Sequence, residues 1–399
     1  MISADDNRQL TSVGPGTPLG EVLRRYWVPV GLSADVTDHP QLVRIFGEDL
    51  VLFRTKQGQA GLMDARCAHR GASLVYGWVE EDGIRCRYHG WRYAANGRCT
   101  EIPGETGRAE PGRPAAETRL QQKTYETREL GGLVFAYMGP QPAPALPRLD
   151  TLVRTDGVRK ATVARMIACN FLQIVENSMD PMHLPFVHGE SIKVWAALPQ
   201  FEIEDTPWGL KQIQYRPGPT PAERYVRALV YFLPFNRMVG IPAPEDDFST
   251  ATTTRTIWAV PVDDTHTIEF EVRFQPSKGG RPVDFRFEST PADFELELEQ
   301  PFQQYRVPAA GRVSYPKFFG AQDQLMQLSQ GPIAPREHEH LRTSDRGVIA
   351  VRKALRQAIQ DVKDGRDPRG VMRGEAGERV IAVDLEDHLE PVDASLAPA

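Results

Sequence analysis

The sequence predicts an α+β protein, in which an N-terminal all-β domain precedes a C-terminal domain built of an antiparallel sheet flanked by helices. Short alternating segments separated by turn residues fill the first third of the chain. A proline-rich stretch, Gly139–Pro147, then marks a boundary. Beyond it, helix-like segments enclose strand-like ones. The expected division is an N-terminal helix packed on the C-terminal domain (1–26), the β domain (27–138), a linker (139–150), the C-terminal domain (151–377) and a tail (378–399).

The elements of the N-terminal part follow from apolar spacing and turn residues. A helix is predicted from Pro18 to Tyr26, because Leu19, Val22 and Leu23 fall on one helical face. Asn96-Gly97 is a strong signal for a hairpin turn. The strands expected around it are Leu42–Phe46, Leu50–Arg54, Gln59–Asp64, Arg85–Tyr88 and Trp91–Ala94.

The pattern changes in the second half of the chain. Residues 169–188 are typical of a helix with a proline interruption, and residues 194–287 are typical of antiparallel strands. Residues 291–365 return to a helical pattern, with capping residues at Thr343-Ser-Asp345. The residues after 377 are expected to form an extended, partly disordered tail.

Composition limits the classes of function. The 399 residues carry a net charge of −6, with 41% apolar and 25% charged residues, which is ordinary for a globular protein. The sequence has no basic stripe of the kind that would suggest a nucleic-acid partner. The polar N-terminus lacks the core of a signal peptide, and no apolar run reaches membrane-spanning length. We therefore expect a cytoplasmic protein with no membrane contact.

Two short motifs each combine one cysteine with one histidine: Cys67-Ala-His69 and Cys86-Arg-Tyr-His89. Two thiolates and two imidazoles are the ligands of a Rieske [2Fe–2S] centre. The alternative is a structural zinc site, although zinc motifs usually pair like with like. The mixed pairing favours the cluster. The other two cysteines, Cys99 and Cys169, are predicted to be small buried thiols.

A [2Fe–2S] centre needs a source of electrons. The chain has neither the cysteine run of a plant-type ferredoxin nor a dinucleotide-binding glycine motif after a strand-like segment. We therefore expect a separate protein to supply the electrons.

A second candidate site lies in the segment that runs from Asn170 to Gly189. His183 and His188 are five residues apart, and Pro185 between them argues against one continuous helix. Two histidines and a carboxylate are the ligands of mononuclear Fe(II) oxygenases, but a histidine pair near a helix end can also cap or pack. Asp180 lies one helical turn before His183, where its carboxylate could orient the imidazole.

These motifs resemble those of the Rieske non-haem iron oxygenases, in particular the α subunits of the phthalate-dioxygenase-like branch. The resemblance covers most of the chain; Arg87 stands where many relatives have proline. It implies a helix-grip (START-like) catalytic domain that holds Fe(II). In that family's pattern, the metal ligands are His183, His188 and a downstream carboxylate matched by Asp323, Asp180 connects the iron to a cluster histidine of another subunit, and Asn177 lies near the iron.

The resemblance also implies a function. By this resemblance, the chain would be the terminal oxygenase of a multicomponent system and would hydroxylate or dihydroxylate a small, carboxylated aromatic substrate, as in aromatic compound catabolism. It would use O₂ and electrons from a separate NAD(P)H-dependent reductase that contains flavin and a ferredoxin-type centre. Alternatives are O-demethylation or monooxygenation of a methoxy or methyl aromatic, and an electron carrier without oxygenase activity. A head-to-tail homotrimer, or a stacked hexamer, would let Asp180 contact His89 of a neighbour.

Further residues are candidates for the substrate pocket. Apolar side chains suit an aromatic ring, and arginines suit a carboxylate, although each arginine can equally be structural. His338 and His340 alternate with glutamates and are predicted to be surface residues. The pocket candidates are Phe171, Val175, Leu184, Val230, Phe232, Arg227, Arg237 and Arg255.

Overall fold

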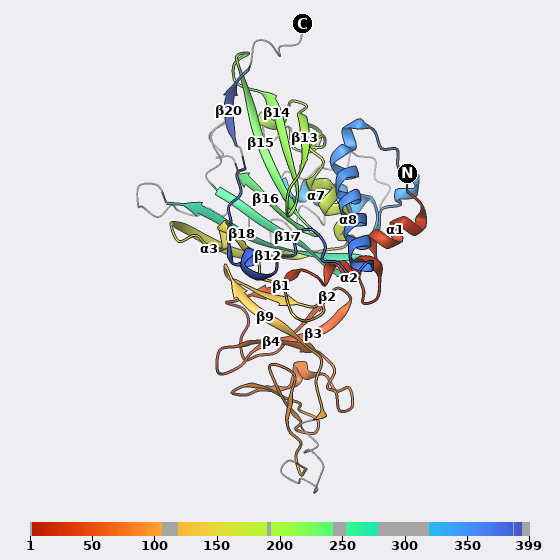
Figure 1. Cartoon of the computed structure of the whole chain (residues 1–399), viewed down its shortest axis with the longest axis vertical. Coiled ribbons are helices and arrows are strands. Elements are labelled where there is room, and N and C mark those ends of the chain that lie inside the picture. The colour runs from red at the N-terminus through yellow and green to blue at the C-terminus, as the bar shows by residue number, and fades with distance from the viewer. Residues whose placement is uncertain are drawn as a thin grey trace, which may run out of the picture.

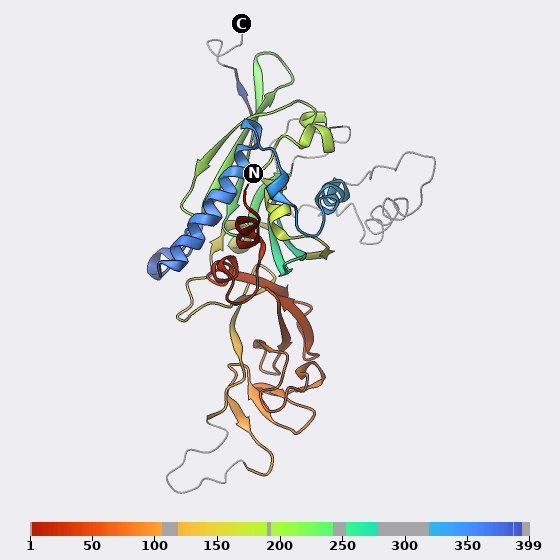
Figure 2. The same ribbon diagram turned by 90° about the vertical axis from the view of Figure 1, so that its right-hand side faces the viewer.

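The computed structural model describes residues 2–105, 119–189, 193–241, 253–277, 319–385 and 387–392. It confirms the predicted α+β class: a β domain at one end of an elongated molecule and a sheet-and-helix domain at the other (Figure 1). The turned view in Figure 2 shows the same separation. No helix in these ranges is long and apolar enough to cross a membrane.

The chain begins with two short helices, α1 (Ala4–Thr11) and α2 (Pro18–Leu23). The prediction missed α1, because its apolar stripe is short; a capping box at Ser3 and Asp6 fixes its start. Helix α2 starts at the predicted proline but ends at Leu23 rather than Tyr26, since the backbone turns there into the first strand. Asn7 donates to the carbonyl of Ala334, which ties α1 to the far end of the sequence.

The β domain contains two antiparallel sheets. A six-stranded sheet has the order β1-β10-β9-β4-β3-β2, and a four-stranded sheet has the order β5-β6-β7-β8. The predicted strand Arg85–Tyr88 is wrong beyond Arg85, because Cys86–Gly90 forms a tight turn. The strands are β1 (Trp27–Leu32), β2 (Gln41–Ile45), β3 (Glu48–Arg54), β4 (Ala60–Asp64), β5 (Trp78–Val79), β6 (Gly83–Arg85), β7 (Arg92–Ala94), β8 (Cys99–Glu101), β9 (Thr124–Leu130) and β10 (Leu133–Tyr137).

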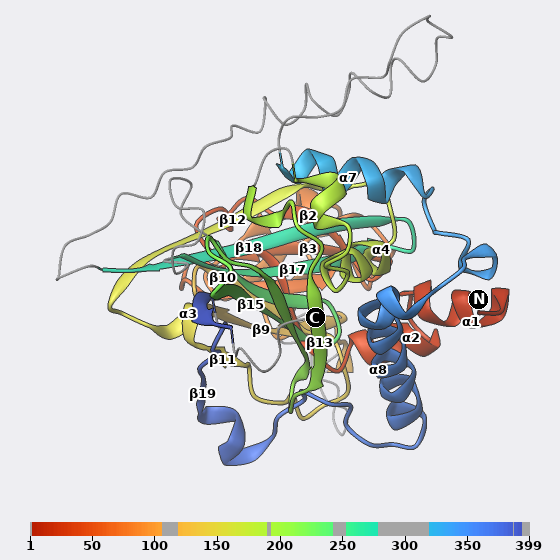
Figure 3. The same ribbon diagram turned by 90° about the horizontal axis from the view of Figure 1, so that it is seen from above.

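The second domain is built on one large antiparallel sheet of order β12-β18-β17-β16-β15-β14-β13. The prediction missed β12, which forms one edge. Helix α4 packs against β17, α7 and α8, and Figure 3 shows these helices around the sheet from above. The bounds are β12 (Gly157–Ile167), α4 (Phe171–Ser178), α5 (Leu184–Val187), β13 (Gln200–Asp205), β14 (Gly209–Pro217), β15 (Glu223–Phe232), β16 (Asn236–Ile241), β17 (Thr253–Asp263), β18 (His266–Pro276), α7 (Phe319–Ser329) and α8 (Arg346–Lys363).

Short elements complete the described part: β11 (Arg148–Leu149), α3 (Asp150–Val153) and five 3₁₀ turns at Leu74–Tyr76, Lys193–Trp195, Arg336–His338, Thr343–Asp345 and Gly374–Glu378. The helical pattern predicted for 291–365 is therefore observed only in α7, α8 and short turns. Its first part, 291–318, lies outside the described residues, as do the last residues of the predicted strand region.

The residues after 377, expected to form an extended tail, include segments that pair with the body of the domain. Two strands lie beyond residue 377: β19 (Val380–Ile381) pairs with β11, and β20 (His388–Pro391) pairs with β15. Strand β15 is longer than its hairpin partner β16, so β16 does not pair with Glu223–Val226. Because buried backbone groups need hydrogen-bond partners, β20 pairs with these residues instead.

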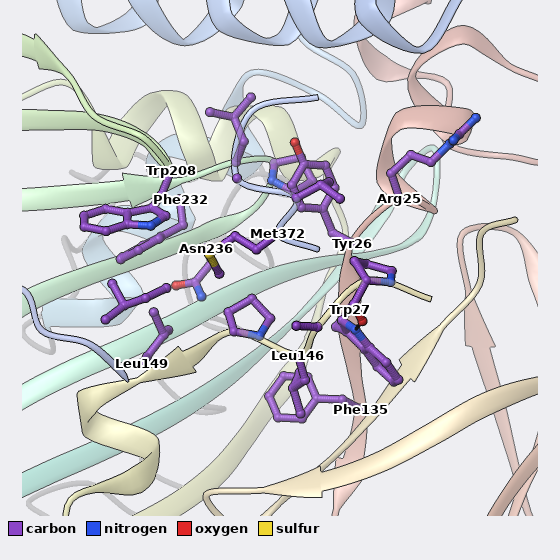
Figure 4. Close-up of a pocket in the computed structure, with 18 of the residues that line it drawn as sticks. Arg25, Tyr26, Trp27, Phe135, Leu146, Leu149, Trp208, Phe232, Asn236 and Met372 are labelled. Carbon is purple, nitrogen blue, oxygen red and sulfur yellow. Dashed lines mark hydrogen bonds between the residues drawn. The ribbon is translucent and has the colours of Figure 1, made fainter. Parts of the chain in front are cut away.

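A cavity of ≈ 50 Å³ lies where the linker crosses the large sheet (Figure 4). Aromatic side chains surround it, among them Tyr26, Trp27, Trp208 and Phe232. Trp27 donates to the carbonyl of Pro144, so the linker is fixed against the first strand. This cavity is part of the contact between the two domains.

Candidate metal centres

The two cysteine–histidine motifs form matching loops. In each loop, the backbone N–H of a glycine that follows the histidine donates to the carbonyl of the cysteine. Gly71 donates to Cys67 over 2.8 Å, and Gly90 donates to Cys86 over 3.0 Å. Both glycines have positive φ, 74° and 72°, a conformation that other residues adopt only at a cost. The sequence therefore folds the two motifs into equivalent hairpin tips.

The four donor side chains are arranged in two pairs. Cys67 and Cys86 are buried and adjacent, whereas His69 and His89 are half-buried, with ring centroids 4.7 Å apart. The hydroxyl of Tyr93 lies 3.2 Å from the Cys67 sulfur. A Rieske cluster needs two sulfur ligands on an inner iron and two imidazoles on an outer one, and this separation fits it.

The same arrangement argues against the zinc alternative. A tetrahedral zinc needs four ligand atoms around one ion. Within the described ranges, the group of donor side chains close enough to share a single ion is His183, His188 and Asp323, not the four residues of the loops. The loops therefore suit a two-iron cluster better than one zinc ion.

The second site is assembled from three side chains at two helices, α5 and α7. His183 and His188 flank the single turn of α5 at its two ends, and Pro185 starts that turn instead of interrupting a longer helix. Asp323 lies on α7, far away in the sequence. Its Oδ1 atom is 3.0 Å from Nε2 of His188 and 3.5 Å from Nε2 of His183. The three ligand atoms all lie within 4.8 Å of one another, which fits two histidines and one carboxylate on one ion.

Hydrogen bonds fix the orientation of all three side chains. Nδ1 of His188 lies 2.8 Å from Oε1 of Gln322, and the side chain of Asn177 donates to Oδ1 of Asp323 over 3.2 Å. A metal-binding histidine usually has such a partner on its other nitrogen. The hydrogen bond from His188 and the charge of His183 hold the pKa of Asp323 below its usual value, although burial opposes this. Burial lowers the pKa of His183.

The role expected for the Asp180 carboxylate in orienting His183 is wrong. Nδ1 of His183 lies 2.5 Å from the backbone carbonyl of Asp180, while the carboxylate accepts from the backbone of Met182. The peptide group is closer because the chain turns there between α4 and α5. One consequence is that the carboxylate is not engaged by the histidine beside it.

Buried charges support the helix that precedes this site. Glu176 on α4 accepts from Arg336 over 2.8 Å and from Arg352 over 2.6 Å, and all three side chains are buried. The two guanidinium groups hold the pKa of Glu176 below its usual value despite burial. Gln173 bonds the carbonyl of Gln327 on α7. The contact of Gln173 therefore holds α4 against α7, the helix that carries Asp323, whereas Glu176 holds α4 against α8 and the turn at Arg336–His338.

The structure separates the predicted pocket residues. Side chains alternate along a strand. Arg227 on β15 lies on the face toward the iron-site helices, so Val230 and Phe232 lie on the opposite face, and Phe232 lines the interdomain cavity in Figure 4. Their assignment to the substrate pocket is therefore wrong. Phe171, Val175 and Leu184 are buried around the iron-site helices.

The arginine candidates differ from one another. Arg237 is ion-paired with Glu269 and Arg255 with Glu271, so both have structural partners. Arg227 instead lies over the ring of Trp195. Sequence reasoning missed Trp195, Phe319 and Gln322; only Gln322, next to Asp323, had a signal in its position. His338 and His340 are exposed, and Cys99 and Cys169 are buried, as predicted.

The two centres lie far apart within one chain. The cluster loops belong to the β domain, the lower part of Figure 1, whereas α7, which carries Asp323, lies in the upper domain. In the described part of the chain, no hydrogen bond or ion pair joins Asp180 to His69 or His89.

Comparisons with known proteins agree with both domains. Residues 26–125 match the Rieske [2Fe-2S] domain family, and residues 136–384 match the family described as LigXa C-terminal domain like. The 5,5'-dehydrodivanillate O-demethylase oxygenase subunit of Sphingobium sp. is 34% identical, over 96% of this chain and 86% of the relative. The phenoxybenzoate dioxygenase α subunit of Ectopseudomonas oleovorans is 37% identical, over 92% of this chain and 88% of the relative.

Solved structures show the same fold. Dicamba monooxygenase bound to dicamba superposes with a TM-score of 0.60 at 17% identity, covering 86% of this chain and 99% of the other. The oxygenase in the reduced complex with ferredoxin from carbazole 1,9a-dioxygenase gives 0.59 at 21% identity, covering 91% and 98%. With two matched domains and relatives of similar length, the chain belongs to the Rieske non-haem iron oxygenases, as an oxygenase α subunit.

Proposed function

We propose that this protein is the terminal oxygenase of a multicomponent system that uses O₂ to oxidise a substituted, carboxylated aromatic compound. The observation that carries the proposal is the convergence of His183, His188 and Asp323 in a domain separate from the cluster loops. An electron carrier would need only the cluster. The proposed electron donor is a separate NAD(P)H-dependent reductase that contains flavin and a ferredoxin-type centre.

Each residue has a proposed role. Cys67, Cys86, His69 and His89 would hold the [2Fe–2S] cluster, and His183, His188 and Asp323 would hold Fe(II). When bound, the cluster supplies single electrons and the ferrous ion offers open positions for O₂. The peptide carbonyl of Asp180 and the amide of Gln322 keep the two imidazoles oriented. Asn177 steadies the carboxylate of Asp323 without needing to bind the metal.

Two reaction outcomes remain within this proposal. The relatives include an O-demethylase oxygenase subunit and dioxygenase subunits, at similar identity. Ring hydroxylation or dihydroxylation, and oxidation of a methoxy or methyl group, would use the same three metal ligands. Identification of the product distinguishes them, because O-demethylation releases formaldehyde and dihydroxylation does not.

We also propose a head-to-tail homotrimer, or a stacked hexamer of two trimers, in the cytoplasm. In such a ring, the Asp180 carboxylate of one subunit contacts His89 of the next. Exposed aromatic side chains near both centres support a contact between copies: Tyr88 is 61% and Tyr76 70% exposed at the cluster end, and Phe186 is 78% exposed beside His183 and His188. Large exposed apolar groups commonly mark protein interfaces.

The test is a reconstituted assay. Protein loaded with cluster and Fe(II) is combined with a reductase, NADH and a panel of methoxy-, hydroxy- and unsubstituted aromatic acids, and both O₂ uptake and product mass are measured. We expect O₂ uptake coupled to an oxygenated or demethylated product. A protein that binds about two irons per chain, rather than about three, and consumes no O₂ with any of these compounds would instead be an electron carrier.

A further inference from the structure

Two arginines share the face of the large sheet that looks toward the iron-site helices. In the β14–β15 ladder, Gln214 is opposite Arg227 and Arg216 is opposite Tyr225. Residues directly opposite each other in a ladder lie on the same face, as do alternate residues along each strand. The two guanidinium groups therefore belong to one group of polar side chains on two neighbouring strands.

Both arginines are buried with unused donors. Arg216 is 2% exposed and Arg227 is 7% exposed. Arg216 donates from one nitrogen to Gln214, and Arg227 donates from one nitrogen to the carbonyl of Gly240. Among the residues that the structure describes, Nε and Nη2 of Arg216 and Nε of Arg227 have no acceptor, and neither does the indole nitrogen of Trp195. Buried polar groups normally have partners, so these donors indicate an absent acceptor.

Other arginines on this face show what a completed pair looks like. Arg237 lies 2.8 Å from Glu269, and Arg255 lies 2.7 Å from Glu271. Arg216 and Arg227 have no such carboxylate within ion-pair distance in the described ranges. Asp387 attracts Arg227 but forms no ion pair with it in the described residues: its Oδ1 accepts from Tyr225, and its Oδ2 has no hydrogen-bond partner there. Burial lowers the pKa of Arg216 to about 9, as does the neighbouring charge of Arg227.

An aromatic side chain, Trp195, lies between Arg227 and the iron site. The guanidinium of Arg227 lies 4.4 Å from the centre of the Trp195 ring. That ring lies 6.1 Å from the ring of His188 and 5.5 Å from the ring of Phe319. The ring of Trp195 therefore lies in contact with the guanidinium of Arg227 and close to an iron-site histidine.

We propose that Arg216 and Arg227 form the subsite that binds the carboxylate of the substrate and thereby presents its aromatic ring to the iron. A carboxylate is a planar acceptor that a guanidinium group can grip with two parallel hydrogen bonds. It would accept hydrogen bonds from the unused Nε and Nη2 donors of Arg216 and from Nε of Arg227, and it would offset one of the two buried positive charges. The inference rests on the proposed function and names the charged group of its substrate and the residues that select it.

The test compares aromatic acids with their uncharged primary amides. The probes are benzoate, 3-methoxybenzoate, 4-methoxybenzoate, phthalate and 3-phenoxybenzoate, each paired with its amide, titrated by anaerobic calorimetry into protein loaded with cluster and iron. We expect at least one acid to bind tenfold or more tightly than its amide. If every acid binds no more tightly than its amide, the proposal is wrong.

Variants locate the preference. Arg227→Gln and Arg216→Gln are each expected to reduce the acid-to-amide ratio at least tenfold, with affinity for the amide changed less than threefold. Arg224→Gln is the matched control: Arg224 is on the same strand but on the opposite face, where it pairs with Glu390. It should keep the wild-type ratio. An unchanged ratio in both Arg216→Gln and Arg227→Gln would overturn the assignment.

A folding defect would not hide the result. Cluster absorption and iron content report whether each variant is intact, and Arg227→Lys, which keeps the charge but loses the planar fork, should show an intermediate ratio. The assay also separates the two proposals. Arg227-dependent binding of acids without O₂ uptake would support the subsite but not the oxygenase. Coupled oxidation of neutral aromatics, without any preference for acids, would support the oxygenase but not the subsite.

Discussion

Nε2 of His188 lies 3.0 Å from Oδ1 of Asp323, although the two residues are separated by most of the large sheet in the sequence. His183 approaches the same carboxylate oxygen from a different direction, with the two imidazole planes at 77°. The three donor atoms therefore lie close enough together to share one ion. An ion held by two imidazoles and one carboxylate would have further coordination positions open for O₂.

Replacing Asp323 should remove the mononuclear iron without affecting the cluster. In Asp323→Ala, iron content should fall from about three to about two per chain, because the carboxylate ligand is lost while the two cluster irons stay. Metal analysis and the visible spectrum check this. Asp205→Asn, at an exposed position, is the control. If Asp323→Ala retains the wild-type iron content, Asp323 is not a ligand.

The amide of Gln322 should matter for iron binding even though it does not touch the metal. Gln322→Leu removes the acceptor that orients the imidazole of His188. Loss of such a partner typically reduces metal affinity about 10- to 100-fold. Competition with a chelator measures the affinity, and Gln330→Leu, at an exposed position directly after the end of α7, should leave it unchanged. Equal affinities in both variants would contradict the orienting role.

Replacing the Asp180 carboxylate should block electron transfer between the two centres. Because its peptide carbonyl, not its carboxylate, contacts His183, Asp180→Asn should keep both iron content and the cluster spectrum. Turnover should fall by two orders of magnitude or more, as about 3 kcal/mol added to the barrier would cause. O₂ uptake at saturating reductase is the measurement, and wild-type turnover would exclude the proposed path.

Mixed oligomers distinguish electron transfer between subunits from electron transfer within one subunit. One chain carries Asp180→Asn and the other carries Cys67→Ser, which prevents cluster assembly; each alone should be inactive. Coexpressed in one ring, the intact cluster of the first chain can serve the intact iron site of the second. We therefore expect activity to return in the mixture. Two inactive chains that stay inactive together would indicate transfer within a chain.

The buried ion pairs of Glu176 with Arg336 and Arg352 should contribute both to the stability of the protein and to iron binding. Glu176→Gln leaves Arg336 and Arg352 buried without their shared carboxylate. Breaking a buried ion pair in this way costs about 3–5 kcal/mol. Urea unfolding should show that loss, together with weaker iron retention, because α4 sets the position of the loop that carries His183. Glu204→Gln, at an exposed strand position, is the control and should change neither.

The pH dependence of stability should depend on Glu271. The guanidinium groups of Arg255 and Arg273 outweigh burial and lower the pKa of Glu271 from 4.5 to about 2. A carboxylate with a lowered pKa stabilises the fold fully above its usual pKa, and that contribution is lost as the pH falls from about 4.5 toward 2. The contribution is about 3 kcal/mol. Urea midpoints of wild type and Glu271→Gln should therefore differ at pH 7 and converge as the pH is lowered; a constant difference would contradict this assignment.

The sequence by itself determined the chemistry of the two centres. Cys67, His69, Cys86 and His89 are close to one another along the chain, and the glycine in each motif requires a tight turn, so local rules are enough to predict two loop tips that carry ligands. Strands β17 and β18 could equally be predicted, since the alternation of side chains along a strand is a local property of the sequence. Helix α1 was missed because capping groups rather than apolar spacing define it.

Only the tertiary structure decided which distant residues meet. Asp323 was named through a resemblance, because nothing in the spacing of α7 shows that its first turn approaches α5. Gln322, Trp195 and the pair Arg216 and Arg227 acquire a role only when strands and helices far apart in sequence are packed against one another. The physical reason is that metal coordination and charge pairing depend on distances of a few ångströms, whereas sequence patterns report only which side of its own element a residue occupies.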